Sequence, residues 1–114
     1  MHLVFIVARD WTLRAGVRAE LREKGIDALG QESMDDLAMA LAAGQTPAAL
    51  VIEAGAEGTQ TAAAAQLMRR FPSLFVASRA DKFDLPAGVI LLYRPVRVGE
   101  IVERVIEIVK GLPA

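Results

Sequence analysis

The sequence predicts an α/β domain built on a doubly wound, five-stranded parallel sheet. Short apolar runs alternate about five times with longer amphipathic stretches, and most connections between them are short. Parallel strands need crossover connections, and right-handed crossovers place helices on both faces of a sheet. An eight-fold barrel would need roughly twice the length of this 114-residue chain. We therefore expect an open sheet in one domain spanning residues 1–114.

The first strand and helix are indicated by a buried apolar run and a four-residue repeat. Leu3–Val7 is continuously apolar, which is typical of a strand covered on both faces. Residues 11–24 are predicted to form a helix, with Asp10 as its N-cap and Gly25 just beyond its end. Its inward-facing residues are expected to be Leu13, Val17 and Leu21.

A shorter helix separates the second and third strands. Ile26–Gln31 is a weak strand pattern, and Ser33 begins a helix because an acidic residue follows it three positions later, close to a capping box. The core side of this helix is expected to hold Leu37, Ala40 and Leu41. Gly44 ends the helix, and the third strand is predicted over Ala48–Ile52, with Glu53 at its end.

The second half of the chain contains strong helix signals and one weak connection. An alanine-rich helix is predicted from about residue 59 to residue 70, and strands over Leu74–Ala77 and Gly88–Tyr93. Residues 78–87 have little apolar periodicity, so the helix between strands four and five is expected to be short or missing. The final helix, after Pro95, has one apolar stripe, formed by Val98, Ile101, Val102, Val105, Ile106 and Val109.

Composition excludes several classes of function. The net charge is −1 and the pI is about 5.8, so the chain lacks the basic field of nucleic-acid binding proteins. No apolar run approaches the roughly 20 residues that cross a bilayer, and the first residues lack the features of a signal peptide. Cysteine is absent, which excludes a thiolate zinc site and fits a reducing compartment. We expect a cytoplasmic protein without a cofactor.

Several further residues are assigned structural roles. Met34, Met39 and Met68 occupy helical positions and are expected to fill the core. Trp11, at the start of the first predicted helix, is expected to be a packing residue or to lie on the rim of a site at the strand ends. His2 is the only histidine, so no Ser/His/Asp or Cys/His triad can be assembled. We therefore expect no enzymatic activity.

Residues that could carry chemistry follow the ends of the predicted strands. In open parallel sheets, sites form beyond the carboxyl ends of the strands, near the point where the strand order reverses. The segments at those ends are Ala8-Arg9-Asp10, Glu53-Ala54-Gly55, Ser78-Arg79 and Arg94-Pro95.

The order and spacing of these segments resemble the receiver domain of bacterial response regulators over nearly the whole chain. The family carries an acidic pair after the first strand, a phosphoacceptor aspartate after the third, a serine or threonine after the fourth and Lys-Pro after the fifth. The corresponding residues here are Ala8 and Arg9, then Glu53, Ser78, and Arg94-Pro95. The resemblance implies the strand order 2-1-3-4-5. In the family this architecture binds magnesium and accepts a phosphoryl group from a histidine kinase.

The acidic positions depart from the family pattern. Magnesium prefers oxygen ligands, but Ala8 and Arg9 provide no carboxylate, and Arg9 adds a positive charge. At ~4 Å and an effective dielectric near 20, each unit charge contributes about 4 kcal/mol, so we expect no bound metal. Glu53 carries one methylene more than aspartate, and phosphoryl transfer without a metal is very slow.

These departures predict that the site is filled from within the chain. Arg9, Arg94 or both are expected to pair with Glu53, because a guanidinium group suits a carboxylate. Ser78 could donate a hydrogen bond to Glu53, which would then imitate a permanently modified aspartate. The alternative is that Glu53 is a solvated carboxylate and Arg9 a surface residue.

The pattern as a whole predicts a non-catalytic signalling module that acts by protein–protein contact. Its expected partner is a histidine kinase or a downstream signalling protein. Loss of the helix between strands four and five would expose Tyr93, which favours a homodimer through strands four and five and the final helix. Two alternatives stay open: an atypical phosphoacceptor using Glu53 or Asp10, and a small anion- or nucleotide-binding domain using the loop Gly55–Thr59.

Overall fold

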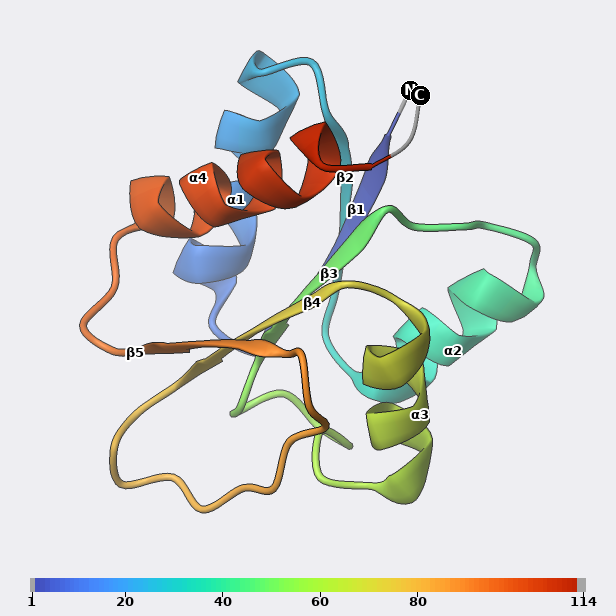
Figure 1. Cartoon of the computed structure of the whole chain (residues 1–114), viewed down its shortest axis with the longest axis vertical. Coiled ribbons are helices and arrows are strands. Elements are labelled where there is room, and N and C mark those ends of the chain that lie inside the picture. The colour runs from blue at the N-terminus through green and yellow to red at the C-terminus, as the bar shows by residue number, and fades with distance from the viewer. Residues whose placement is uncertain (1, 113–114) are drawn as a thin grey trace.

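Five parallel strands and four helices alternate along residues 2–112, except between the last two strands. The computed structural model describes residues 2–112, and Figure 1 shows the arrangement of its elements. In chain order these are β1 (Leu3–Val7), α1 (Trp11–Glu23), β2 (Asp27–Gln31), α2 (Met34–Ala42), β3 (Ala49–Glu53), α3 (Ala62–Arg70), β4 (Ser73–Ala77), β5 (Ile90–Tyr93) and α4 (Val98–Lys110).

The strands lie in the predicted order β2-β1-β3-β4-β5, and every neighbouring pair is parallel. The strand order reverses between β1 and β3, whose register runs from Val4 opposite Ala49 to Val7 opposite Ile52. Because all the strands point the same way, their carboxyl ends meet at one edge of the sheet. The edge strands are β2 and β5.

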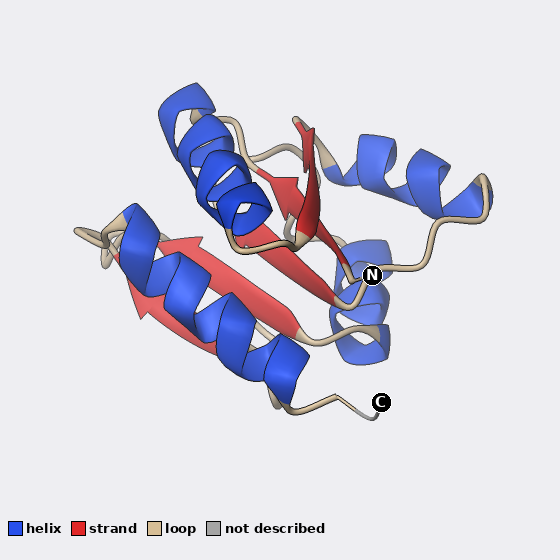
Figure 2. Ribbon diagram, turned by 90° about the horizontal axis from the view of Figure 1, so that it is seen from above, coloured by secondary structure: helices blue, strands red, loops and turns tan. Residues whose placement is uncertain are grey.

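Each face of the sheet has its own helical layer and its own apolar core. Helices α1 and α4 cover one face, and α2 and α3 cover the other (Figures 1 and 2). Side chains alternate along β1, so Val4 and Ile6 pack under α1 and α4, whereas Phe5 and Val7 pack under α2 and α3. All of these β1 side chains are fully buried, which confirms that this strand is covered on both faces.

Two helices begin at the N-caps that the sequence predicts. Asp10 Oδ1 accepts a hydrogen bond of 3.2 Å from the backbone N–H of Leu13 at the start of α1. Ser33 Oγ accepts one of 3.1 Å from the N–H of Asp36 at the start of α2. These bonds satisfy amide groups that the first turn of a helix otherwise leaves without a partner. No helix among residues 2–112 is long and apolar enough to cross a membrane.

Helix α3 begins later than predicted, at Ala62 instead of near Thr59. Gly58 has a φ of +85°, which interrupts helical geometry just before that point. Thr59 is buried, and its hydroxyl donates to the carbonyl of Ala54 at 3.2 Å. Thr61 then provides the N-cap. Alanine content predicted the helix, but side-chain hydrogen bonds decided where it starts.

Other details of the prediction were also wrong. Met34 and Met68 lie in the core, but Met39 is 71% exposed on the outer side of α2. β5 begins at Ile90 and not at Gly88, because Gly88 has a φ of +91° in the turn that precedes the strand.

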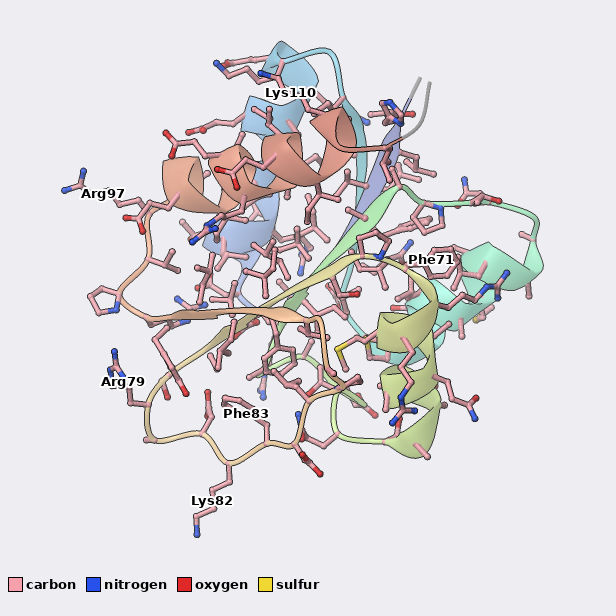
Figure 3. All side chains as sticks on the ribbon, viewed as in Figure 1. Phe71, Arg79, Lys82, Phe83, Arg97 and Lys110 are labelled. Carbon is pink, nitrogen blue, oxygen red and sulfur yellow. The ribbon has the colours of Figure 1, made fainter. Side chains whose placement is uncertain are left out.

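The helix predicted to be short or missing between β4 and β5 is absent, and residues 78–89 form an irregular connection. Phe83 from this connection packs against the sheet, with its ring centroid 5.3 Å from that of Phe75 and 6.4 Å from that of Tyr93 (Figure 3). Leu85 and Val89 are partly buried on the same side. These apolar side chains cover the part of the sheet beside β5 that lacks a helix.

Candidate functional site

The residues singled out in the sequence come together at the carboxyl edge of the sheet. Ala8 follows β1, Glu53 is the last residue of β3, Ser78 follows β4 and Arg94 follows β5. The site therefore lies beside the reversal of strand order between β1 and β3, where ligands bind in open α/β sheets.

Glu53 is held by backbone and side-chain donors. Its side chain is only 13% exposed. Oε1 accepts a hydrogen bond of 2.8 Å from the backbone N–H of Arg9 and a longer one of 3.2 Å from that of Asp10. Oε2 lies 3.6 Å from Nη2 of Arg94. Hydrogen bonds to an ionised carboxylate are stronger than neutral ones, so this side chain is fixed in place.

Arg94 joins two carboxylates from separate parts of the chain, one at the N-cap of α1 and one at the end of β3. Its Nη2 donates to Asp10 Oδ2 at 3.2 Å, in addition to the contact with Glu53. Arg94 and Asp10 are each about one-third exposed at the side chain. The guanidinium group of Arg94, which follows β5, thus links the start of α1 to the end of β3.

Asp10 connects the site to helix α1. Its pKa is held below the ordinary value of 3.8, first by the hydrogen bond from the backbone N–H of Leu13. Partial burial acts in the opposite direction, and the hydrogen bond and charge of Arg94 lower the pKa further. Asp10 is therefore ionised at neutral pH and serves as both helix cap and ion-pair partner.

Asp10 is the residue whose role sequence reasoning missed. The sequence indicated an N-cap and a less favoured phosphoacceptor, but not the partner of Arg94. Its position gave a usable signal, since it is the only acidic residue in the segment after the first strand and must lie at the same edge as Arg94.

Arg9 takes part through its backbone and not through its guanidinium group. Among residues 2–112 no ion pair involves its side chain, which is exposed. Of the two arginines expected as partners of Glu53, Arg94 forms the ion pair, and the carboxylate accepts the backbone N–H of Arg9. The Arg9 side chain lines an open cleft of about 750 Å³ together with Glu32, Ser33, Asp36, Gly55 and Glu57.

Ser78 and Pro95 follow β4 and β5 at the same edge of the sheet. The backbone N–H of Ser78 donates to Asp81 Oδ2 at 2.8 Å. No hydrogen bond between Ser78 and Glu53 is found in the described part of the chain, so the expected hydroxyl donor is not in place. Pro95 is exposed and follows Arg94 through a cis peptide bond.

Ala8 is enclosed where the family has an acidic residue. It is fully buried, its N–H donates to the carbonyl of Gln31, and its carbonyl accepts from Arg14 Nη1 at 2.6 Å. The methyl side chain belongs to the core cluster under α1 and α4. A carboxylate here would be buried at a large desolvation cost.

The side chains at the site do not provide the oxygen ligands that a magnesium ion needs. Ala8 provides no ligand, and the oxygens of Glu53 and Asp10 are already bound by amide N–H groups and by Arg94. Within residues 2–112 no cluster of three or more acidic, histidine or cysteine side chains is arranged to hold a metal. A divalent cation would also be repelled by the guanidinium group between the carboxylates.

Comparison with known proteins identifies the fold. No family model matches the chain, and no curated protein matches it in sequence. A response regulator receiver protein from Burkholderia phymatum superposes with a TM-score of 0.71 at 21% identity, covering 100% of this chain and 98% of that one. The receiver domain of Francisella response regulator 1452 gives 0.75 at 15% identity, covering 96% and 98%.

A response regulator from Thermotoga maritima is similar to the same extent, with a TM-score of 0.72 at 16% identity and coverage of 97% and 99%. At these identities the similarity shows the fold and not the chemistry. The described chain has the receiver fold, including its strand order.

Proposed function

We propose that the chain is a non-catalytic signalling module with the receiver fold, in which an internal ion-pair network replaces the metal ion and the phosphoryl group. The observation that carries this proposal is that the carboxylate of Glu53 is already engaged within the chain. Both oxygens of its carboxylate are bound within the chain, to the N–H groups of Arg9 and Asp10 and to Arg94.

The network makes Glu53 a poor nucleophile. Attack on a phosphoryl donor needs a free carboxylate oxygen and a cation that neutralises the transferred group. Here the nearest cation, Arg94, is engaged by Glu53 and Asp10. Freeing Glu53 would break charge-assisted hydrogen bonds worth about 1.5–3 kcal/mol each.

Signalling would then depend on contact with another protein and not on modification. The exposed residues around the site are suited to this, because Arg9 and Trp11 project from the same loop and helix start, and Trp11 is 69% exposed. Exposed tryptophan and arginine residues are enriched in interface hot spots. We propose that the partner is a histidine kinase or a downstream signalling protein. A cytoplasmic location stays a prediction.

The phosphoryl-transfer test is direct. The protein is incubated with acetyl phosphate and Mg²⁺ and analysed by intact-mass spectrometry, beside a receiver domain that has its full set of acidic residues. We expect no added phosphoryl group on this chain under conditions that modify the reference domain. A stable adduct on the wild-type chain that disappears in Glu53→Gln would overturn the proposal and favour an atypical phosphoacceptor.

A gain-of-function variant gives the matched control. Arg9→Asp adds a carboxylate at an exposed position without disturbing the core. Combined with Glu53→Asp, it restores part of the acidic set that a divalent cation needs. We expect Mg²⁺ to raise the melting temperature of the double variant more than that of the wild type. An equal Mg²⁺ response in both proteins would contradict the view that the lack of aspartate carboxylates at positions 9 and 53 prevents cation binding.

A further inference from the structure

β5 is an edge strand that carries none of the charges or prolines that commonly prevent edge pairing. It runs from Ile90 to Tyr93 and contains no charged residue and no proline, and in the part of the chain that the structure describes it pairs only with β4. Exposed edge strands of this kind readily pair with another strand, and proteins usually protect them with charges, bulges or covering segments.

The outward-facing backbone groups of β5 follow from its register. The N–H of Arg94 donates to the carbonyl of Ala77, so the even-numbered residues direct their backbone groups toward β4. Peptide groups alternate along a strand, and those of Leu91 and Tyr93 therefore point away from the sheet. In residues 2–112 no hydrogen-bond partner is recorded for either outward N–H.

The backbone positions just before and just after this pair add no further free N–H group to the edge. The next outward N–H before Leu91 belongs to Val89, and it donates to the carbonyl of Pro86 at 3.4 Å. The next one after Tyr93 would belong to Pro95, which has no N–H. The open edge thus presents the backbone groups of Leu91 and Tyr93, at equal distances from Leu92.

At the opposite edge of the sheet, arginine side chains lie against the outward-facing residues of β2. In β2 the outward residues are Ala28 and Gly30, since the N–H of Asp27 donates to the carbonyl of His2, which directly precedes β1. Arg18 Nε donates to the carbonyl of Ala28 at 3.3 Å. The side chain of Arg14 passes so close to Gly30 that an added Cβ there would lie 2.9 Å from it. Arginine side chains protect the β2 edge, whereas within the described residues no arginine side chain donates a hydrogen bond to the backbone of β5.

The flanking elements leave the β5 edge accessible. In Figure 1 α4 lies above β5 and the 78–89 connection lies below it, and no ribbon passes in front of the strand. Tyr93 is 36% exposed, and the guanidinium carbon of Arg79 lies over its ring at 4.5 Å from the centroid.

We propose that β5 pairs antiparallel with β5 of a second copy of the chain, about a twofold axis at Leu92. Leu91 of one copy would lie opposite Tyr93 of the other, and each of these residues would donate and accept one backbone hydrogen bond. The open edge is uncharged and symmetric about Leu92, so it is complementary to itself under a twofold rotation. This inference is independent of the proposed function of the Glu53 site.

The expected interaction is modest. Only a four-residue strand and its flanking side chains take part, less than the roughly 800 Å² per partner of a standard interface. We therefore expect a dissociation constant on the order of 10–100 µM.

Cysteine cross-linking tests both the pairing and its register. Across the twofold axis, the two Leu92 residues would form a non-hydrogen-bonded pair with Cα atoms about 4.5 Å apart, within the range for a disulfide. The chain has no cysteine, so Leu92→Cys has no background reaction. Ile90→Cys is the matched control, because Ile90 lies on the same face of β5 but about 13 Å from its counterpart in this register.

We expect mild oxidation at about 100 µM protein, near the expected dissociation constant, to give a covalent dimer of Leu92→Cys and a monomer of Ile90→Cys. Circular dichroism confirms that both variants are folded. Failure of Leu92→Cys to cross-link, or equal cross-linking of both variants, would refute the proposed pairing.

Sedimentation of the cysteine-free protein gives an independent readout. Tyr93→Lys should weaken self-association at least about tenfold, because edge lysines oppose strand pairing. Met39→Lys, at the 71% exposed position on α2, should have no effect. A wild-type chain that stays monomeric at about 1 mM, well above the expected dissociation constant, would overturn the proposal.

Discussion

Nη2 of Arg94 lies 3.2 Å from Oδ2 of Asp10, and this ion pair links the end of β5 to the start of α1. The same nitrogen lies 3.6 Å from Oε2 of Glu53. One guanidinium group therefore balances two carboxylates at the carboxyl edge of the sheet. The residues that bind it are far apart in sequence, so the network forms only when the sheet is complete.

Removing the guanidinium group should destabilise the fold slightly. Arg94→Met leaves two neighbouring carboxylates without their shared cation, and we expect a loss of about 1 kcal/mol because the pair is partly exposed. Arg94→Lys should retain part of this stability but not the forked geometry. Urea unfolding measures both variants. Arg97→Met is the control, and an equal loss there would show that the effect is not specific to the network.

The stability of the fold should depend on pH through Asp10. Because the pKa of Asp10 is lower in the folded chain than its ordinary 3.8, the ionised form stabilises the fold above that pH. This contribution is lost as the pH falls through the folded pKa. Asp10→Asn keeps an N-cap acceptor but cannot ionise.

The difference in unfolding free energy between wild type and Asp10→Asn should therefore be largest near neutral pH and should shrink in acid. Urea unfolding over a series of pH values measures it. A difference that stays constant down to pH values below 3.8 would contradict the ionic role of Asp10.

Gly55→Ala tests how tightly Glu53 is held. An added Cβ at Gly55 would lie 2.7 Å from Glu53 Oε2, so the carboxylate would have to move. We expect the backbone amides of Arg9 and Asp10 to lose protection from hydrogen exchange, with a stability loss of about 1 kcal/mol. Gly44→Ala adds a methyl group where no atom lies within 4 Å but the backbone is left-handed, so it controls for backbone strain alone. Gly44→Ala should leave the hydrogen exchange of the Arg9 and Asp10 amides unchanged.

Phe83 should contribute more to stability than its place in an irregular connection suggests. Its ring packs against Phe75 and Tyr93 on the part of the sheet that has no helix. Phe83→Ala should cost about 2 kcal/mol, since the residue is only partly buried and full burial would give more. Lys82→Ala, at the exposed neighbouring position, should stay within about 0.5 kcal/mol of wild type in thermal unfolding. A loss of similar size in both would show that Phe83 does not anchor the connection.

Much of the architecture could be predicted because it depends on local patterns. The apolar run Leu3–Val7 and the stripe on α4 follow from the periodicity of buried side chains. The absence of a helix between β4 and β5 was predicted because residues 78–87 have little apolar periodicity. Capping and turn residues were less predictable, so α3 begins at Ala62 and β5 at Ile90, later than the sequence indicated.

The candidate site could be predicted only as a set of positions. The sequence placed Glu53 and Arg94 at strand ends that share one edge of a parallel sheet, because strand direction fixes that edge. It could not choose between Arg9 and Arg94 as the partner of Glu53, since both have the right charge. The folded chain directs the Arg9 backbone N–H at the carboxylate and leaves its side chain in the cleft.

The amino-acid pattern by itself determined the order of strands and helices, their buried faces and the lack of carboxylates at Ala8 and Arg9, because these depend on residue type and spacing. Only the tertiary structure decided that Arg94 also binds Asp10, that Ser78 is not a donor to Glu53, and that the β5 edge is left unprotected. The physical reason is that hydrogen bonds and ion pairs depend on ångström-scale direction and distance. Those are set by how separate strands and loops pack together.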